Sequence, residues 1–107
     1  MTDLIVVTDA NLEDAVLKNE RPVVVAIGAS WCPDCRRAEP FYMQLASAYG
    51  DRAVFARCNS EDNPKVVQHF DVQHIPTMVV VKAGKTVDRI VEMKTPSSLR
   101  DFFERNL

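Results

Sequence analysis

The chain has 107 residues, of which 47% are apolar and 26% are charged, and its formal net charge is −2. This length suits one domain, and the composition, close to the average of soluble globular proteins, excludes a disordered tail, a collagen-like repeat and a coiled coil. The weak net charge provides no broad field that would attract nucleic acid or an anionic membrane.

The amino-terminal end lacks the features of a secretory signal. An acid, Asp3, comes early, and the apolar run Leu4–Val7 that follows it has only four residues. The longest uncharged apolar run, Val23–Ala29, has seven residues, whereas a membrane-spanning helix needs about 20. We therefore expect one monomeric cytoplasmic domain over residues 1–107, with no membrane or nucleic acid among its partners.

Five segments have the character of strands. Pro22–Ile27 is a β-branched run too apolar to alternate, which is typical of a strand covered on both faces. Thr86–Val91 follows a short turn containing Gly84, which indicates a hairpin with the preceding strand. The expected strands are Leu4–Val7, Pro22–Ile27, Ala53–Cys58, Met78–Lys82 and Thr86–Val91.

Four helices are expected between and after these strands, each opened by a residue that can cap it. The caps are Thr8 or Asp9, then Cys32, Asn63 before Pro64, and Thr95 before Pro96. Apolar residues at helical spacing predict buried faces formed by Leu12, Ala15 and Val16 in the first helix and by Phe41, Leu45 and Ala48 in the second. The second helix runs from Pro33 to Tyr49, and the last two end near Phe70 and Arg105.

The element order is then β-α-β-α-β-α-β-β-α. Helices between strands imply parallel crossovers, while the tight turn at Gly84 makes the last pair of strands antiparallel. The sequence therefore predicts an α/β fold, with a mixed central sheet of about five strands and helices on both faces.

A cysteine pair, Cys32 and Cys35, lies where the strand at Pro22–Ile27 gives way to the long helix. Unpaired backbone N–H groups and the positive end of the helix dipole at that position favour an anion. Since the thiolate is the form that attacks a disulfide, Cys32 is the expected nucleophile. Cys35, almost one turn later, is within reach to displace a substrate from a mixed disulfide.

A metal site and an inert structural pair are the alternatives for these cysteines. Structural zinc takes four ligands, and the remaining candidates, Cys58, His69 and His74, show no ligand spacing. The total of three cysteines is odd and too small for a disulfide scaffold. The predicted βαβ context and the adjacent Trp31 favour redox chemistry.

Several short motifs in order make the chain resemble thioredoxin over nearly its whole length. They are Trp31-Cys32-x-x-Cys35, Pro40 in the following helix, Asn59, Asn63-Pro64, Ile75-Pro76-Thr77 before a strand, and Lys82-x-Gly84. The resemblance implies the thioredoxin fold, a reversible Cys32–Cys35 dithiol–disulfide cycle, and a cis peptide bond between Ile75 and Pro76. It also implies a kink at Pro40.

The resemblance also implies partners and binding residues. Clients would be disulfide-containing proteins, positioned by Ile75 and Pro76 and flanked by Trp31. A flavoprotein reductase of the thioredoxin reductase type, drawing on NADPH, would restore the dithiol. The chain itself has no Gly-rich dinucleotide fingerprint, so no bound cofactor is expected beyond the redox-active disulfide. Peroxide or nitrosothiol reduction would use the same cysteines.

The residues between the cysteines, Pro33 and Asp34, are expected to tune the acidity of Cys32. Pro33 suits the first helical turn, and Asp34 favours the helix start but places a like charge beside the nascent thiolate. A less stabilised thiolate makes the disulfide less oxidising, so we expect a reductant. This pair departs from the Gly-Pro usual in the family.

Other departures concern the proton and the client groove. Where the family has a buried acid, the chain has Ala26, so the Cys35 proton would pass to water or to Asp34. The lysine that the family usually has near that acid is Arg57 here. Because an unpaired buried charge is very costly, Arg57 must find another carboxylate or reach solvent. A family tryptophan is replaced by Gly28. The missing acid also motivates an alternative function, a redox-sensing adaptor with little turnover.

At the groove, His74 and Glu92 stand where the family often has glycine, which predicts a bulkier, more polar rim and a narrower client range. His74 is either a group that stabilises the Cys32 thiolate when protonated or an ordinary exposed loop histidine. Cys58 is expected to be a buried free thiol, with a regulatory disulfide or glutathione adduct as the alternative. For Trp31, burial in the core is the alternative to an exposed position.

Overall fold

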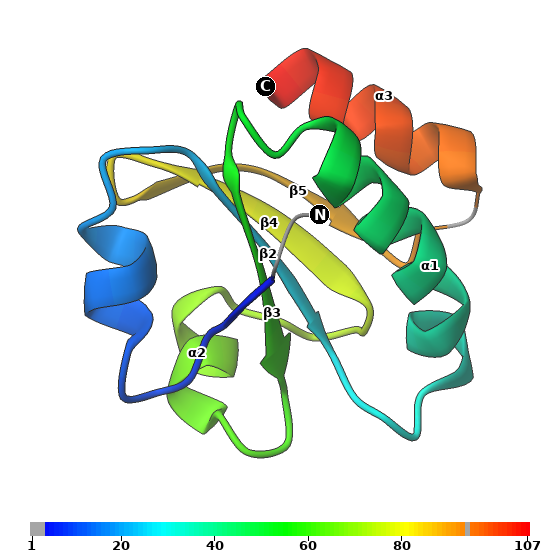
Figure 1. The fold of residues 1–107 in the computed structure, drawn as a ribbon. Helices are drawn as coiled ribbons and strands as arrows, with labels where there is room; N and C mark the ends of the chain where they lie inside the picture. The colour runs from blue at the N-terminus through cyan, green and yellow to red at the C-terminus, as the bar shows by residue number, and fades with distance from the viewer. Residues whose placement is uncertain (1–3, 94) are drawn as a thin grey trace.

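The computed structural model describes residues 4–93 and 95–107. Within them, five strands form one mixed sheet in the order β1-β3-β2-β4-β5, with helices on both faces (Figure 1). The elements are β1 (Ile5–Val6), η1 (Glu13–Leu17), β2 (Val23–Gly28), α1 (Pro33–Ala48), β3 (Val54–Asn59), α2 (Pro64–His69), β4 (Thr77–Lys82), β5 (Lys85–Val91) and α3 (Pro96–Asn106). This confirms the predicted element order, with the first helix reduced to a short π-helix, η1.

The connection from β3 through α2 to β4 was expected to be a parallel crossover, and this expectation is wrong. β1 and β3 pair in parallel, as do β3 and β2, but β4 runs antiparallel to β2. The cause is that α2 is too short. Its six residues rise about 9 Å, whereas the six residues of β3 cover about 20 Å. Because α2 cannot return the chain to the start of β3, β4 begins near the edge where β3 ends.

The hairpin between β4 and β5 is confirmed. Lys82 pairs with Lys85 across the two-residue turn of Ala83 and Gly84, whose φ angles are 52° and 79°. Positive φ at both central positions matches the twist of paired strands, and glycine adopts it without steric cost.

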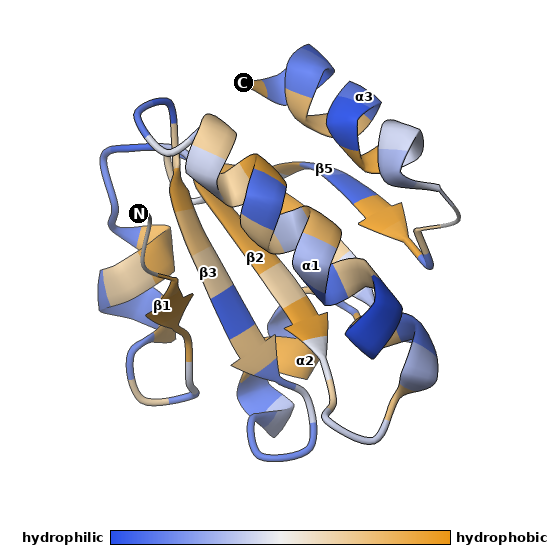
Figure 2. Ribbon diagram, turned by 45° about the vertical axis from the view of Figure 1, so that its right-hand side comes forward, coloured by the Kyte–Doolittle hydropathy of each residue, from blue (hydrophilic) through white to orange (hydrophobic). Residues whose placement is uncertain are grey.

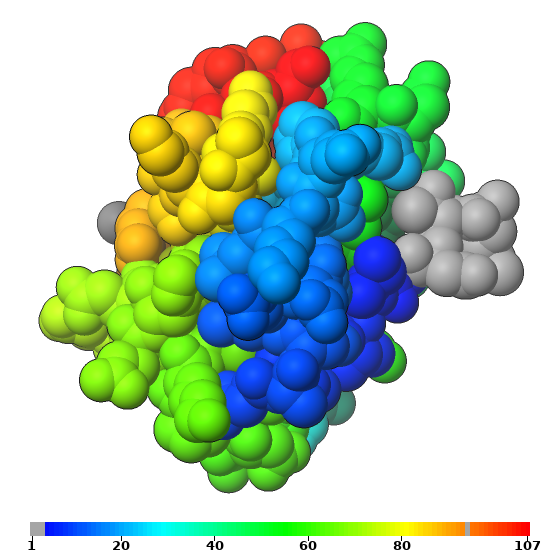
Figure 3. Space-filling model, turned by 90° about the vertical axis from the view of Figure 1, so that its left-hand side faces the viewer, coloured from blue at the N-terminus to red at the C-terminus, as the bar shows by residue number. Residues whose placement is uncertain are grey.

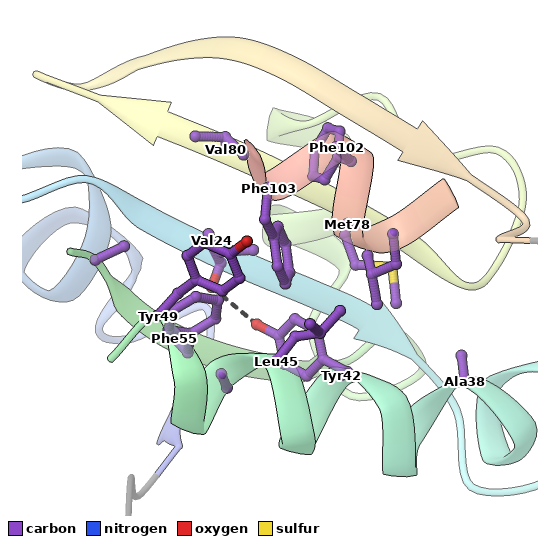
Figure 4. Packing of buried hydrophobic residues seen from close by; sticks show 13 residues of the cluster. Val24, Ala38, Tyr42, Leu45, Tyr49, Phe55, Met78, Val80, Phe102 and Phe103 are labelled. Atoms are coloured by element: carbon purple, nitrogen blue, oxygen red, sulfur yellow. Dashed lines mark hydrogen bonds between the residues drawn. The ribbon is translucent and has the colours of Figure 1, made fainter. Parts of the chain in front are cut away.

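Two apolar cores lie on opposite faces of the sheet. The larger core packs α1 and α3 on the sheet, and it includes Tyr42, Phe55 and Phe103 in edge-to-face contacts (Figure 4). The second core lies beneath η1 and α2. Strand β2 contributes to both, which confirms the strand covered on both faces. Among the described residues, no helix combines the length and apolar character needed to cross a bilayer.

The buried face of α1 differs from the predicted one. Leu45 is buried, but Phe41 is 37% exposed and Ala48 is also exposed; the buried stripe continues instead through Tyr42. The Tyr42 hydroxyl donates to the carbonyl of Ala56 at 2.7 Å and also lies 3.2 Å from the carbonyl of Val24. These backbone partners, invisible to helical periodicity, orient the helix on the sheet.

The helix caps follow the sequence in two cases and depart from it in the other two. Cys32 caps α1, and Thr95 caps α3 in a reciprocal arrangement with Ser98. Asn63 precedes α2 but does not cap it. Its amide oxygen instead accepts from Asp9 N at 2.9 Å, and the Asp9 carboxylate accepts from Val66 N at 3.0 Å.

Asp9 therefore caps α2 across the fold rather than the first helix. Figure 3 shows the amino-terminal segment against the segment that holds α2. The predicted cap of the first helix at Thr8 or Asp9 is wrong, because η1 begins after Leu12 and has no side-chain cap. The Thr8 hydroxyl accepts from Asn11 N at 3.3 Å in the turn before η1.

Candidate redox site

The site is built where β2 ends and α1 begins, at the edge where the parallel strands β2 and β3 both end (Figure 1). Cys32 has extended backbone angles, φ −82° and ψ 114°, and is the residue just before the helix. Its Sγ accepts a hydrogen bond from Cys35 N at 3.2 Å. This is the predicted N-cap geometry, in which a backbone N–H and the helix dipole both favour a thiolate.

Cys35 is half-buried one turn into the helix. Burial first, and then its hydrogen bond with Cys32, raise the pKa of Cys35 to about 12. The close approach of β2 is possible because residue 28 is glycine: a Cβ there would lie 2.9 Å from the Cys35 Sγ. All three cysteines are free thiols, so this is the reduced form.

The loop before β4 reaches the same point from far along the chain. The Ile75–Pro76 peptide bond is cis, and the Ile75 carbonyl lies 3.9 Å from the Cys32 Sγ. The Pro76 carbonyl accepts from Glu92 N at 2.8 Å, which ties this loop to the end of β5. Backbone groups of residues 35 and 75 thus meet at the Cys32 sulfur.

Two further predicted binding residues, Trp31 and His74, are both exposed. Trp31 is 64% exposed, which excludes the core position, and its indole N–H donates to the Glu61 carboxylate. His74 is exposed, and its Nδ1 lies 3.5 Å from the Glu92 carboxylate. Glu61 was missed by the sequence analysis, because no local pattern connects it to Trp31.

The first turn of α1 is strongly hydrophilic (Figure 2). Pro33 occupies the first helical position, and the exposed Asp34 forms an ion pair with Arg37. The like charge expected beside Cys32 is therefore present, but Arg37 offsets part of it.

A cavity of about 380 Å³ adjoins Cys35 on the α1 side of the sheet. Ala26 and Arg57, which face each other in the β2–β3 register, both line it. Arg57 was expected either to pair with another carboxylate or to reach solvent. It is exposed, so it reaches solvent. Glu39, also missed from the sequence, lines the cavity as well; its spacing of four residues from Cys35 was the available signal.

Cys58 is buried at 4% exposure, and burial raises its pKa to about 11. It matches the expected buried free thiol. Over residues 4–93 and 95–107, no group of three or more His, Cys, Asp or Glu side chains is arranged to hold a metal ion.

Comparison with known proteins agrees with the geometry. A family model described as Thioredoxin matches residues 3–105. A thioredoxin of Chlorobaculum thiosulfatiphilum is 37% identical over 84 residues, 78% of each chain. Thioredoxin 1 of Synechococcus elongatus is 32% identical over 101 residues, 94% of each chain, and a thioredoxin of Pyropia yezoensis is 33% identical over 87% of each. The chain belongs to the thioredoxin family and has its fold.

Proposed function

We propose that this protein reduces disulfide bonds in client proteins through a Cys32/Cys35 dithiol cycle. Its family is one of thiol–disulfide oxidoreductases. The observation that carries the proposal is the meeting of three features at one sulfur: the Cys35 N–H at 3.2 Å, the Ile75 carbonyl at 3.9 Å, and a second thiol one helical turn away.

The cycle has two exchange steps. The Cys32 thiolate attacks a client disulfide, forms a mixed disulfide, and releases one client sulfur as a thiolate. Cys35, after losing its proton, attacks the Cys32 Sγ, so the client leaves with its second sulfur reduced. The client gains two electrons and the Cys32–Cys35 pair becomes a disulfide.

Client positioning follows from the surroundings of Cys32. A client segment lying along Ile75 and Pro76 would bring its disulfide to the sulfur, with the exposed Trp31 on one side. The His74–Glu92 pair adds polar bulk beside it. We therefore propose a narrower client range than a general thioredoxin has. Equal turnover of insulin, a nonspecific disulfide substrate, by this protein and a general thioredoxin would contradict the narrower range.

The cycle requires a source of electrons. We propose a thioredoxin reductase-type flavoprotein using NADPH, with this chain acting as a cytoplasmic monomer that binds no cofactor of its own.

The deciding experiment is NADPH-coupled disulfide reduction with a thioredoxin reductase. The wild type should turn over repeatedly, Cys32→Ser should be inactive, and Cys58→Ser is the matched control that should keep wild-type turnover, because Cys58, although it lines the cavity beside Cys35, is buried with a raised pKa that keeps its thiol protonated. Stoichiometric trapping of clients by Cys35→Ser without wild-type turnover would instead favour the redox-sensing adaptor. Full activity of Cys32→Ser would refute the cycle.

A further inference from the structure

The cavity beside Cys35 is large enough to hold water. Its volume of about 380 Å³ compares with about 30 Å³ for one liquid water molecule. Its wall includes the Cys35 side of α1, Ala26 of β2 and Arg57 of β3, so it is not wholly apolar. Among the residues that the structure describes, no ion pair joins two residues of this wall.

Cys35 needs a proton acceptor. Its burial holds the thiol protonated at neutral pH, with a pKa of about 12, and only a thiolate attacks the mixed disulfide. Ala26 brings no titratable group to the wall of the cavity beside it.

Among the described residues that line the cavity, Glu39 is the one carboxylate. It lies four residues after Cys35, so the two side chains are neighbours on the same helix face. The ion pairs found between described residues do not include Glu39, which leaves its oxygens available to water.

The other titratable groups near Cys35 are poor acceptors. Arg36 and Arg57 line the cavity as cations, and burial raises the pKa of Tyr42 and of Cys58, which keeps both protonated. Asp34 acts on Cys35 by charge, but it pairs with Arg37 and is not part of the cavity wall.

We propose that Glu39 accepts the proton of Cys35 through water in this cavity. The role rests on the dithiol cycle proposed above. In the step, the Cys35 S–H proton passes through water to the Glu39 carboxylate, and the Cys35 Sγ bonds to the Cys32 Sγ. The bond between Cys32 and the client sulfur breaks, the client leaves as a thiolate, and Glu39 returns its proton to solvent or to that thiolate.

The two exchange steps can be separated with 5,5′-dithiobis(2-nitrobenzoate). Attack by Cys32 releases one coloured thiolate, and resolution by Cys35 releases a second. Because a positioned general base contributes about 10²–10⁴-fold, Glu39→Gln should slow the second phase by at least about tenfold and leave the first unchanged. Glu39→Asp should retain most of the second-phase rate, and Glu20→Gln, which removes an exposed carboxylate outside the cavity wall, should retain all of it.

The sign of the effect distinguishes a base from a nearby charge. Removing a negative charge near Cys35 favours its thiolate, so a purely electrostatic Glu39 would make the second phase faster in Glu39→Gln. An unchanged or faster second phase overturns the proposal, as does an equal slowing in Asp34→Asn. Loss of the first phase in the wild type would refute the dithiol cycle itself.

The wild-type pH profile decides the question even where a variant disturbs the fold. With a carboxylate base, the second-phase rate should be level between about pH 5.5 and 8, where glutamates stay ionised. Without one, the rate should rise about tenfold per pH unit over the same range, following the Cys35 thiolate, and that result would overturn the assignment.

Discussion

Raised pKa values at two of the three thiols predict a strong selectivity toward a small alkylating reagent, although Cys32 itself is only 5% exposed. The pKa of Cys35 is about 12 and that of Cys58 about 11, against an ordinary value of 9.0. Because a raised pKa keeps the unreactive protonated form to higher pH, the thiolate fractions at pH 8 fall about a thousandfold for Cys35 and about a hundredfold for Cys58. Cys32, whose sulfur accepts a backbone N–H at the helix start, should be modified alone.

The assay is a time course with iodoacetamide on the reduced protein at pH 8, followed by intact mass and peptide mapping. One adduct, on Cys32, is expected. Cys35 should stay unmodified after Cys32 reacts, because burial is the main cause of its raised pKa and does not depend on the Cys32 charge. In guanidinium chloride all three thiols should react at similar rates. Labelling of Cys35 or Cys58 within tenfold of the Cys32 rate would show that the reasoning is wrong.

Three further predictions concern stability. Asp88→Ala, which removes hydrogen bonds to α3 that lower the Asp88 pKa, should cost about 1 kcal/mol in urea unfolding at pH 7. Since the folded-state pKa is depressed, this difference should be present above pH 3.8 and shrink as the pH falls further. Asp9→Ala should cost about 1 kcal/mol by uncapping α2, with faster hydrogen exchange at Val66 N; unchanged exchange would contradict the cap. Leu45→Ala should cost about 2–4 kcal/mol and Phe41→Ala less than about 1 kcal/mol; equal losses would contradict the buried face described above.

The parts of the fold that depend on neighbours in sequence could be predicted. Strand and helix order, the hairpin at Gly84 and the cap at Thr95 each follow from a few adjacent residues. The same holds for the centre of the site, since Cys32 before Pro33 is a local helix start. For these features, propensity and tertiary structure agree.

What could not be predicted depends on contacts between distant residues. The Asp9 cap on α2 joins residues 57 apart in sequence, and no spacing rule reaches that far. The buried face of α1 is selected by the backbone of β2 and β3 through Tyr42, so helical periodicity alone places it one residue away, on Phe41. Trp31 and Glu61, 30 residues apart, are joined in the same way.

The division of labour between the two sulfurs arises from position alone. Both are cysteine thiols on one helix, but Cys32 stands before its first turn and receives a backbone N–H, whereas Cys35 stands inside the turn and supplies that N–H. The first position favours the anion, and the second, half-buried beside Gly28, favours the protonated thiol. The Cys35 N–H is therefore placed to stabilise negative charge on the attacking sulfur, and the resolving thiol stays inactive until a proton acceptor serves it.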